Sequence, residues 1–254
     1  MLKTLHQRVA DRLSLDYWRR AGADALALMP EDLKLLRRRA RKLRAHLDHV
    51  IRTADDRLAL PAIGSTAMRR QPSTDWSLRP EAWRHDIAPM GLVGPPGRSE
   101  FGADLTLFHD SATAEIVLRQ MRNRDRDDAA PYGLCLEVYA HDGSFLSLVV
   151  ELPSDCVSTL RRNHILRVET SIRSERPVEV FARLNVRHGP NIEQLVREFD
   201  LARPDASVEF DLAYSKIDEK RIDKAWLDLI FENAALNQVM LKDLTISRRP
   251  RASI

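Results

Sequence analysis

Ten short segments of strand-like sequence follow one another between about residues 104 and 248, and they limit the possible folds more than any other feature. Each segment alternates apolar and polar side chains, and turn sequences containing Gly, Pro or Asn separate most of them. Many short strands without long helices between them are typical of β-sandwiches and barrels. The sequence therefore predicts a mainly β fold, an antiparallel jelly-roll-like β-sandwich at 104–254 with an N-terminal helical segment. The expected strands are 104–108, 115–122, 134–141, 145–152, 164–173, 178–187, 192–199, 207–214, 225–231 and 239–247.

The first 58 residues have a helical pattern instead. Pro30 suits the first position of a helix, and Glu31 and Asp32 place negative charge in its first turn. An earlier helix is expected at about 4–28. We therefore predict a basic helical segment at 1–58, either a hairpin or coiled-coil-like. Its second helix carries an apolar stripe with spacings of four and three, typical of coiled coils: Leu36, Ala40, Leu43, Leu47, Val50 and Ala54.

Charge is distributed unevenly along the chain. Residues 1–58 carry a net charge of +6, whereas the remainder carries −3. The densest basic run, 37–44, could bind phosphate groups, but it also fits the solvated face of a packed helix. It contains no aromatic residue of the kind that single-stranded nucleic acid stacks on, so nucleic acid is a disfavoured partner. The stripe instead indicates a protein partner or self-association through residues 30–58.

Residues 59–103 differ in composition from both neighbours. Six of the 13 prolines and five of the nine glycines fall here, which predicts a Pro/Gly-rich linker or an extended wrap. Trp76 and Trp83 indicate that part of it packs on another segment, because a free linker rarely carries two tryptophans. A predicted hairpin turn lies further on, at Asp142-Gly143 between two apolar runs.

Alternation within the strands predicts a polar outer face that could bind a ligand. If the strands share one sheet, an aromatic plane lies there beside Arg and Asp groups, an arrangement that suits sugar binding. The alternative is a solvated face with cross-strand ion pairs. The candidate ligand-binding residues are Arg183, Asn185, Arg187, Asp211, Trp226 and Asp228.

Catalytic and metal-binding patterns are missing from the sequence. It contains no HExxH, CxxC, GxSxG or Gly-rich phosphate loop, so we expect no catalytic residue, no metal site and no cofactor. His109, His141 and His188 fit surface or hydrogen-bonding roles. One exception stays open, a structural calcium ion held by loop carboxylates. The carboxylates considered for calcium are Asp110, Asp142 and Asp243.

The number of cysteines and the first residues of the chain indicate the cellular compartment. Cys135 and Cys156 are too few for a disulfide framework, and Cys135 fits a buried structural thiol. The first residues lack a secretory pattern, and no apolar run approaches the about 18 residues that span a bilayer. These features predict a cytoplasmic protein without a membrane span, or one carried on a released particle.

Two resemblances extend this reading. The run Trp-Leu-Asp-Leu-Ile-Phe at 226–231, followed by Leu-Lys-Asp-Leu-Thr-Ile at 241–246, resembles the last two strands of carbohydrate-binding, galactose-binding-like jelly rolls. This implies a jelly roll over about 104–249 and saccharide binding. The chain is also similar to an uncharacterised family of alphaproteobacterial proteins, through Leu-Asn-Val-Arg-His-Gly-Pro-Asn at 184–191 and residues 226–228. That family implies no activity.

Three functions are compatible with these observations. The first is a non-catalytic, carbohydrate-binding-like recognition module whose helices serve attachment or oligomerisation. The second is a structural spike or adaptor protein of a phage-like particle, because jelly rolls often serve in capsids. The third is a hydrolase acting on polysaccharide through Asp211 and Asp228, which requires the two carboxylates to lie about 5–10 Å apart in a cleft.

Overall fold

The computed structural model describes residues 2–59, 71–125, 128–203 and 205–251, with the backbone alone at 2–9, 52 and 55–59. The chain forms two compact units, Met1–Thr53 and Ala54–Ile254. The first is helical and the second holds both β-sheets. Among the described helices, none is both long and apolar enough to cross a membrane.

The helical unit contains two long helices, α1 (Leu2–Asp24) and α2 (Pro30–Ala59), with the 3₁₀ helix η1 (Ala25–Ala27) between them. Pro30 opens α2 as predicted, and Glu31 and Asp32 occupy its first turn. Trp18 and Ala21 of α1 line one cavity together with Leu36 of α2. The two helices therefore turn back on each other near residues 25–29.

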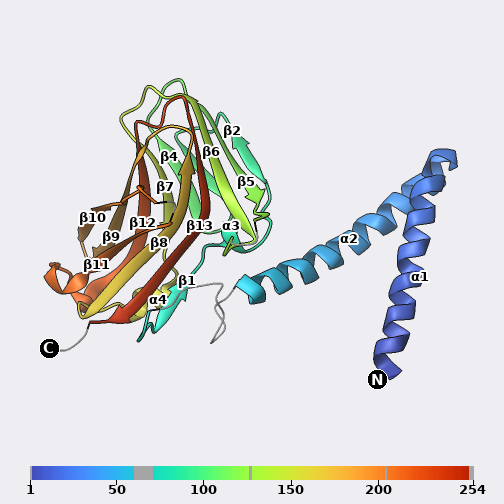
Figure 1. The fold of residues 1–254 in the computed structure, drawn as a ribbon, viewed down its shortest axis with the longest axis horizontal. Coiled ribbons are helices and arrows are strands. Elements are labelled where there is room, and N and C mark those ends of the chain that lie inside the picture. The colour runs from blue at the N-terminus through green and yellow to red at the C-terminus, as the bar shows by residue number, and fades with distance from the viewer. Residues whose placement is uncertain (1, 60–70, 126–127, 204, 252–254) are drawn as a thin grey trace. The chain divides into compact units, whose positions relative to one another are not determined.

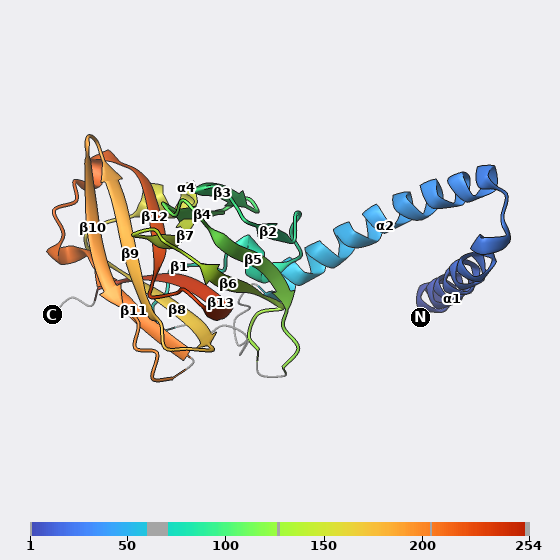
Figure 2. The same cartoon turned by 90° about the horizontal axis from the view of Figure 1, so that it is seen from above.

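The β unit is a sandwich of two antiparallel sheets (Figures 1 and 2), which confirms the predicted fold class. The seven-stranded sheet has the order β11-β8-β13-β6-β5-β2, with β1 paired to β13, and the six-stranded sheet has the order β10-β9-β12-β7-β4-β3. The strands are β1 (Trp76–Leu78), β2 (Gly91–Val93), β3 (Arg98–Phe101), β4 (Leu105–His109), β5 (Glu115–Arg122), β6 (Tyr132–Ala140), β7 (Leu146–Glu151), β8 (His164–Ser174), β9 (Glu179–His188), β10 (Asn191–Glu198), β11 (Asp205–Asp211), β12 (Ile222–Glu232) and β13 (Asn237–Pro250).

All ten predicted strands are present, and the alternation assigns their core-facing side chains. Leu184 of β9 and Leu227 of β12 are buried between the sheets, as are Leu136 of β6 and Phe210 of β11. The predicted strand at 207–214 is wrong at its end, because β11 ends at Asp211 and Tyr214 is 78% exposed. The physical reason is that the chain leaves the sheet after Asp211 and forms the 3₁₀ helix η2 (Leu212–Tyr214).

Both cysteines are buried and free. Cys135 lies in β6, and Cys156 lies in the short helix α4 (Ser154–Thr159), which follows Pro153. Burial raises the pKa of Cys156 to about 12 and also raises the pKa of Cys135. Because the thiolate is the reactive form, these cysteines are packing residues, as predicted for Cys135.

The predicted hairpin at Asp142-Gly143 is wrong. The strand before it, β6, belongs to the seven-stranded sheet, and the strand after it, β7, belongs to the six-stranded sheet. This corner is held by Asp110, whose Oδ1 accepts hydrogen bonds from the backbone N–H groups of Ser144 (2.7 Å) and Phe145 (3.1 Å). A Cβ on Gly143 would meet Asp110 Oδ1 at 2.2 Å, so glycine is needed here for close packing and not for a hairpin turn.

The sandwich begins earlier than the predicted boundary at 104. Residues 60–70 of the expected linker lie outside the described residues, but β1, β2, β3 and the short helix α3 (Glu81–Arg84) join the β unit. Trp83 is fully buried, and its Nε1 donates to the carbonyl oxygen of Leu241 at 3.0 Å. Residues 71–103 are thus a wrap that completes both sheets.

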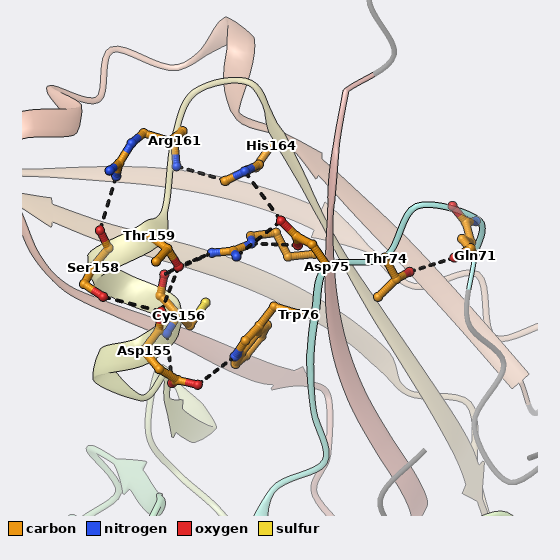
Figure 3. A network of polar contacts seen from close by, with 11 residues as sticks. Gln71, Thr74, Asp75, Trp76, Asp155, Cys156, Ser158, Thr159, Arg161 and His164 are labelled. Carbon is orange, nitrogen blue, oxygen red and sulfur yellow. Dashed lines mark hydrogen bonds and ion pairs between the residues drawn. The ribbon is translucent and has the colours of Figure 1, made fainter. Parts of the chain in front are cut away.

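A polar network fastens the start of this wrap to the sandwich (Figure 3). Trp76 Nε1 donates to Asp155 Oδ2 at 3.1 Å. The buried Arg248 of β13 donates from Nε to Asp75 Oδ1 at 3.0 Å and from Nη1 to Thr159 Oγ1 at 2.7 Å. One guanidinium therefore joins the wrap, β13 and α4.

His164 makes this network sensitive to pH. Its Nδ1 accepts a hydrogen bond from the backbone N–H of Arg161 at 3.0 Å, and its Nε2 lies 3.9 Å from Asp75 Oδ2. Burial, followed by the nearby charge of Arg248, lowers the pKa of His164 below its ordinary 6.5. Protonation of His164 therefore favours the unfolded chain. The stability that the neutral imidazole contributes to the folded chain is complete above pH 6.5 and is lost as the pH falls towards the folded-state pKa.

We expect the free energy of unfolding to decrease between pH 7.5 and pH 5, and to decrease less in His164→Gln. The glutamine side chain can still accept a hydrogen bond but does not titrate. Urea unfolding at several pH values would measure both slopes. Exposed His46 on α2 offers a matched control, and His46→Gln should leave the slope unchanged. Equal slopes for the wild type and His164→Gln would contradict the assignment.

Candidate functional site

The outer face of the six-stranded sheet brings together five of the six candidate residues. In the register of β9 with β12, Asn185 lies opposite Trp226 and Arg183 lies opposite Asp228. Arg187 lies opposite Lys224 one step further along. The side chains of these residues alternate with the core-facing ones on both strands, so they share the outward face.

Their face is hollowed into a groove with a volume of about 400 Å³. We refer to it as the outer-sheet groove. It crosses the sheet from β10 to β3, so all six strands contribute side chains. Its lining residues are Arg98, Thr106, Phe108, Phe145, Ser147, Val149, Glu151, Arg183, Arg187, Ile192, Lys224, Trp226 and Asp228.

A buried carboxylate network underlies the groove. Asp228 Oδ2 accepts from Arg183 Nε at 2.8 Å and Nη2 at 2.7 Å, and also from Asn185 Nδ2 at 3.1 Å. Gln194 of β10 donates to Asn185 Oδ1 at 3.0 Å. Asp228 is only 3% exposed, and its Oδ1 has no hydrogen-bond partner among the residues described here. Charge-assisted bonds of this kind hold a side chain in one orientation, so the network is rigid.

Cationic side chains lie above two of the aromatic rings. Lys224 Nζ lies 5.8 Å from the centre of the Trp226 ring and forms an ion pair with Glu151 at 2.6 Å. Arg98 Cζ lies 5.8 Å from the centre of the Phe108 ring. Each cation is therefore within the distance at which it is attracted to the π face.

Arg187 is held at the side of the groove by Asp223. Its Nε donates to both carboxylate oxygens, at 2.9 and 3.1 Å. This hydrogen bond lowers the pKa of Asp223 and raises that of Arg187, so both groups stay charged at neutral pH. Both side chains are well exposed, so the pair contributes little to stability.

Asp211 does not belong to this face, and the prediction of a shared sheet fails for it. It ends β11, which pairs with β8 in the seven-stranded sheet. There it caps η2 by accepting from Ala213 N at 3.0 Å, and it lies 3.4 Å from Arg251 Nε. Alternation predicts the face within one strand but not the sheet that the strand joins. Asp211 and Asp228 point outward from opposite sheets, so they do not form the carboxylate pair that the hydrolase hypothesis requires.

The three carboxylates considered for calcium are likewise separated by the fold. Asp110 and Asp142 lie at one corner, where hydrogen bonds from Ser111 and then Thr113 lower the pKa of Asp142. Asp243 lies in β13, where it pairs with Arg79. Within the described ranges, no group of three or more His, Cys, Asp or Glu side chains is placed to hold a metal ion.

Several lining residues were not predicted from the sequence. Arg98 and Phe108 come from the far edge of the sheet, and β3 was not recognised as a strand. Glu151 and Lys224 were not singled out, although their positions alternate with core residues and so mark the outward face. What the sequence lacked was the strand order, which places β4 and β7 beside β12.

The fold and the groove define a two-sheet β-sandwich with one polar, aromatic-lined outer face. The chain belongs to a family of unknown function, DUF6478, whose model matches residues 1–254. No curated protein matches the chain in sequence.

Several solved structures are similar to part of this chain. A family 11 carbohydrate-binding module from Clostridium thermocellum, in complex with a β-1,3-1,4-mixed-linked tetrasaccharide, is 10% identical with a TM-score of 0.41, and the match covers 61% of this chain and 97% of that one. The carbohydrate-binding module TmCBM61, in complex with β-1,4-galactotriose, is 14% identical with a TM-score of 0.34, and the match covers 58% and 88%. The enzymatically active domain of bacteriophage CBA120 tailspike protein 4 is 5% identical with a TM-score of 0.40, and the match covers 56% of this chain and only 19% of that chain. Likenesses at this level carry no weight for the ligand of this chain.

Proposed function

We propose that the β unit is a non-catalytic saccharide-recognition module and that the outer-sheet groove is its binding site. The observation that carries the proposal is the groove itself, where Trp226, Phe108 and Phe145 lie among fixed polar groups. Sugar rings present C–H faces to aromatic side chains, and their hydroxyls need donors and acceptors in set positions. The rigid Asp228 network supplies such a position by holding the partly exposed Arg183 guanidinium, a donor, in one orientation.

The proposal is tested by direct binding. We expect the full chain to bind at least one polysaccharide in a panel screened by affinity gel electrophoresis, with isothermal titration for those that retard it. The variant Val149→Arg places a bulky charge on the groove floor and should abolish the retardation. Thr106→Ala, a small change in the same groove, should retain it. Failure of every saccharide in the panel would overturn the function.

A second candidate function is attachment of the module to a protein partner. It is favoured by exposed apolar side chains on α2. The C-terminal half of its apolar stripe is not covered: Leu47 is 53% exposed and Val50 is 63% exposed, whereas Leu36 and Ala40 line the cavity beside α1. A regular stripe of this kind is the surface that a coiled-coil partner covers. A spike or adaptor role would use the same surface.

The charges beside the stripe indicate the kind of partner. In the heptad that the stripe defines, the flanking positions hold Arg37, Arg39, Arg44 and His46, followed by Ile51 and Thr53. A second copy of α2 would place arginine against arginine across the seam, which is unfavourable. The partner that fits is therefore an amphipathic helix with acidic flanking residues. The stripe is narrow, which suits a helical partner. A helix that lies on a membrane surface has a wider apolar face.

We expect the full chain to bind a synthetic heptad peptide with Leu at the seam and Glu at the flanking positions. Leu47→Glu should weaken this binding by at least about tenfold, because it buries a charge in the seam. Leu35→Glu, on the same helix but off the stripe, is the matched control and should bind normally. Fluorescence anisotropy measures the affinity. If light scattering shows a dimer of the full chain that Leu47→Glu dissociates, self-association is the correct reading.

A further inference from the structure

We infer that the outer-sheet groove selects an anionic saccharide, one bearing carboxylate or sulfate groups, over a neutral one. This inference rests on the proposed function of the groove and adds the chemical class of its ligand. It comes from the charges that line the groove and from their positions above the aromatic rings.

Positive side chains outnumber negative ones in the groove. The lining holds four cations, Arg98, Arg183, Arg187 and Lys224, and two carboxylates, Glu151 and Asp228, while Asp223 and Glu100 pair with Arg187 and Arg98 from outside the lining. A concave surface with an excess of one sign concentrates its potential and raises the local concentration of oppositely charged ligands. An anion is therefore attracted most where a cation of the lining is loosely paired.

The aromatic rings do not offer bare faces to a neutral sugar. Lys224 Nζ and Arg98 Cζ each lie 5.8 Å from the centre of the ring that they cover, Trp226 and Phe108 respectively. A neutral sugar that stacked on these faces would displace both cations and lose the cation–π attraction at each ring. An anionic sugar can lie over the same rings while its charged group pairs with the cation.

Two of the four cations are available for such pairing. Arg183 is committed to the buried Asp228 through two short contacts, at 2.8 and 2.7 Å. Arg98 has 69% of its side chain exposed, and its ion-pair partner Glu100 lies at the limit of 4.0 Å. Lys224 pairs with the exposed Glu151, a surface contact of low net worth that a ligand anion can replace.

The Glu151 carboxylate in the groove distinguishes a saccharide from single-stranded DNA, the other anionic polymer of similar width. The Glu151 side chain is 57% exposed, and Lys224 donates to its Oε1, so its Oε2 can accept from a donor of the ligand. Sugar hydroxyls are donors, whereas the phosphodiester backbone of DNA has none. Single-stranded DNA also binds by stacking its bases on open aromatic faces, and here cations cover those faces.

The test compares three polysaccharides on the full chain: polygalacturonate, dextran sulfate, and neutral xylan. We expect one of the two anionic polymers to bind more tightly than xylan by at least about tenfold, with affinity falling between 50 and 500 mM NaCl because the ion pairs are screened. Polygalacturonate and dextran sulfate distinguish carboxylate from sulfate. Arg98→Gln should weaken anionic binding by about three- to tenfold. Arg173→Gln, an exposed arginine on the seven-stranded sheet, is the matched control and should have no effect.

The outcomes distinguish failure of the anionic inference from failure of the proposed saccharide function. Equal or tighter binding of xylan, insensitive to salt and to Arg98→Gln but lost in Val149→Arg, overturns the anionic inference and leaves saccharide recognition standing. Absence of binding to any of the three, together with binding of an oligo-dT probe, overturns both and indicates a nucleic-acid site. Absence of binding to all four probes also overturns both.

Discussion

Trp226→Ala is expected to weaken saccharide binding by roughly 30-fold, a loss of about 2 kcal/mol. Trp226 lies at the centre of the outer-sheet groove, on β12 between Asn185 of β9 and Glu151 of β7. Large aromatic side chains at the centre of a site supply most of its apolar contact, so truncation to alanine costs more there than at the rim. The same change also removes the ring beneath Lys224. Isothermal titration against the tightest-binding polysaccharide measures the effect.

The matched control for this variant is Tyr139→Ala. Tyr139 is 55% exposed on β6, in the other sheet, and lies away from the groove. We expect its saccharide affinity to equal that of the wild type. Circular dichroism and urea unfolding of both variants establish that the fold is intact, because Trp226 points outward and contributes little to the core. An affinity of Trp226→Ala within twofold of the wild type would exclude the groove as the binding site.

Arg79→Met is expected to lower the free energy of unfolding by about 3–5 kcal/mol, the cost of leaving one buried charge without its partner. The Arg79 side chain is 1% exposed. It forms a bidentate pair with Asp243, from Nε to Oδ1 at 2.8 Å and from Nη2 to Oδ2 at 2.9 Å. A loss of this size is a large fraction of the stability of an ordinary domain. The pair joins the wrap to β13, so its removal loosens the wrap as well.

Guanidinium unfolding of three proteins tests this prediction. The double variant Arg79→Met/Asp243→Leu removes both charges and should recover most of the loss, because well-packed apolar residues can replace a buried ion pair at little cost. Arg98→Met, an exposed arginine whose partner lies at 4.0 Å, is the control and should change stability by less than about 1 kcal/mol. A loss below about 1 kcal/mol in Arg79→Met would mean that Asp243 finds other partners.

Local sequence patterns were sufficient for the ten longer strands and their faces. Periodic segments such as 178–187 and 225–231 were predicted as strands, and β9 and β12 occupy these positions with the expected residues inward. Pairing β9 with β12 also confirms that Arg183, Asn185, Arg187, Trp226 and Asp228 share one face, although their role in binding stays a prediction. Short strands with few alternating residues, such as β2 and β3, gave too weak a pattern to recognise.

Contacts between distant segments could not be predicted in this way. Arg79 and Asp243 are 164 residues apart, and nothing in the sequence around either one indicates the other. The exclusion of Asp211 from the groove and the crossing at Asp142-Gly143 have the same origin, because each depends on which sheet a strand joins.

The sequence by itself determined the period-two strands, the helical N-terminus with its apolar stripe, and the side of each strand that faces the core, because these follow from side chains close together in the chain. Only the tertiary structure decided the strand order, the wrap of residues 71–103 and the composition of the groove. The physical reason is that alternation determines two faces for every strand, whereas the choice of neighbouring strands depends on packing among segments far apart in sequence.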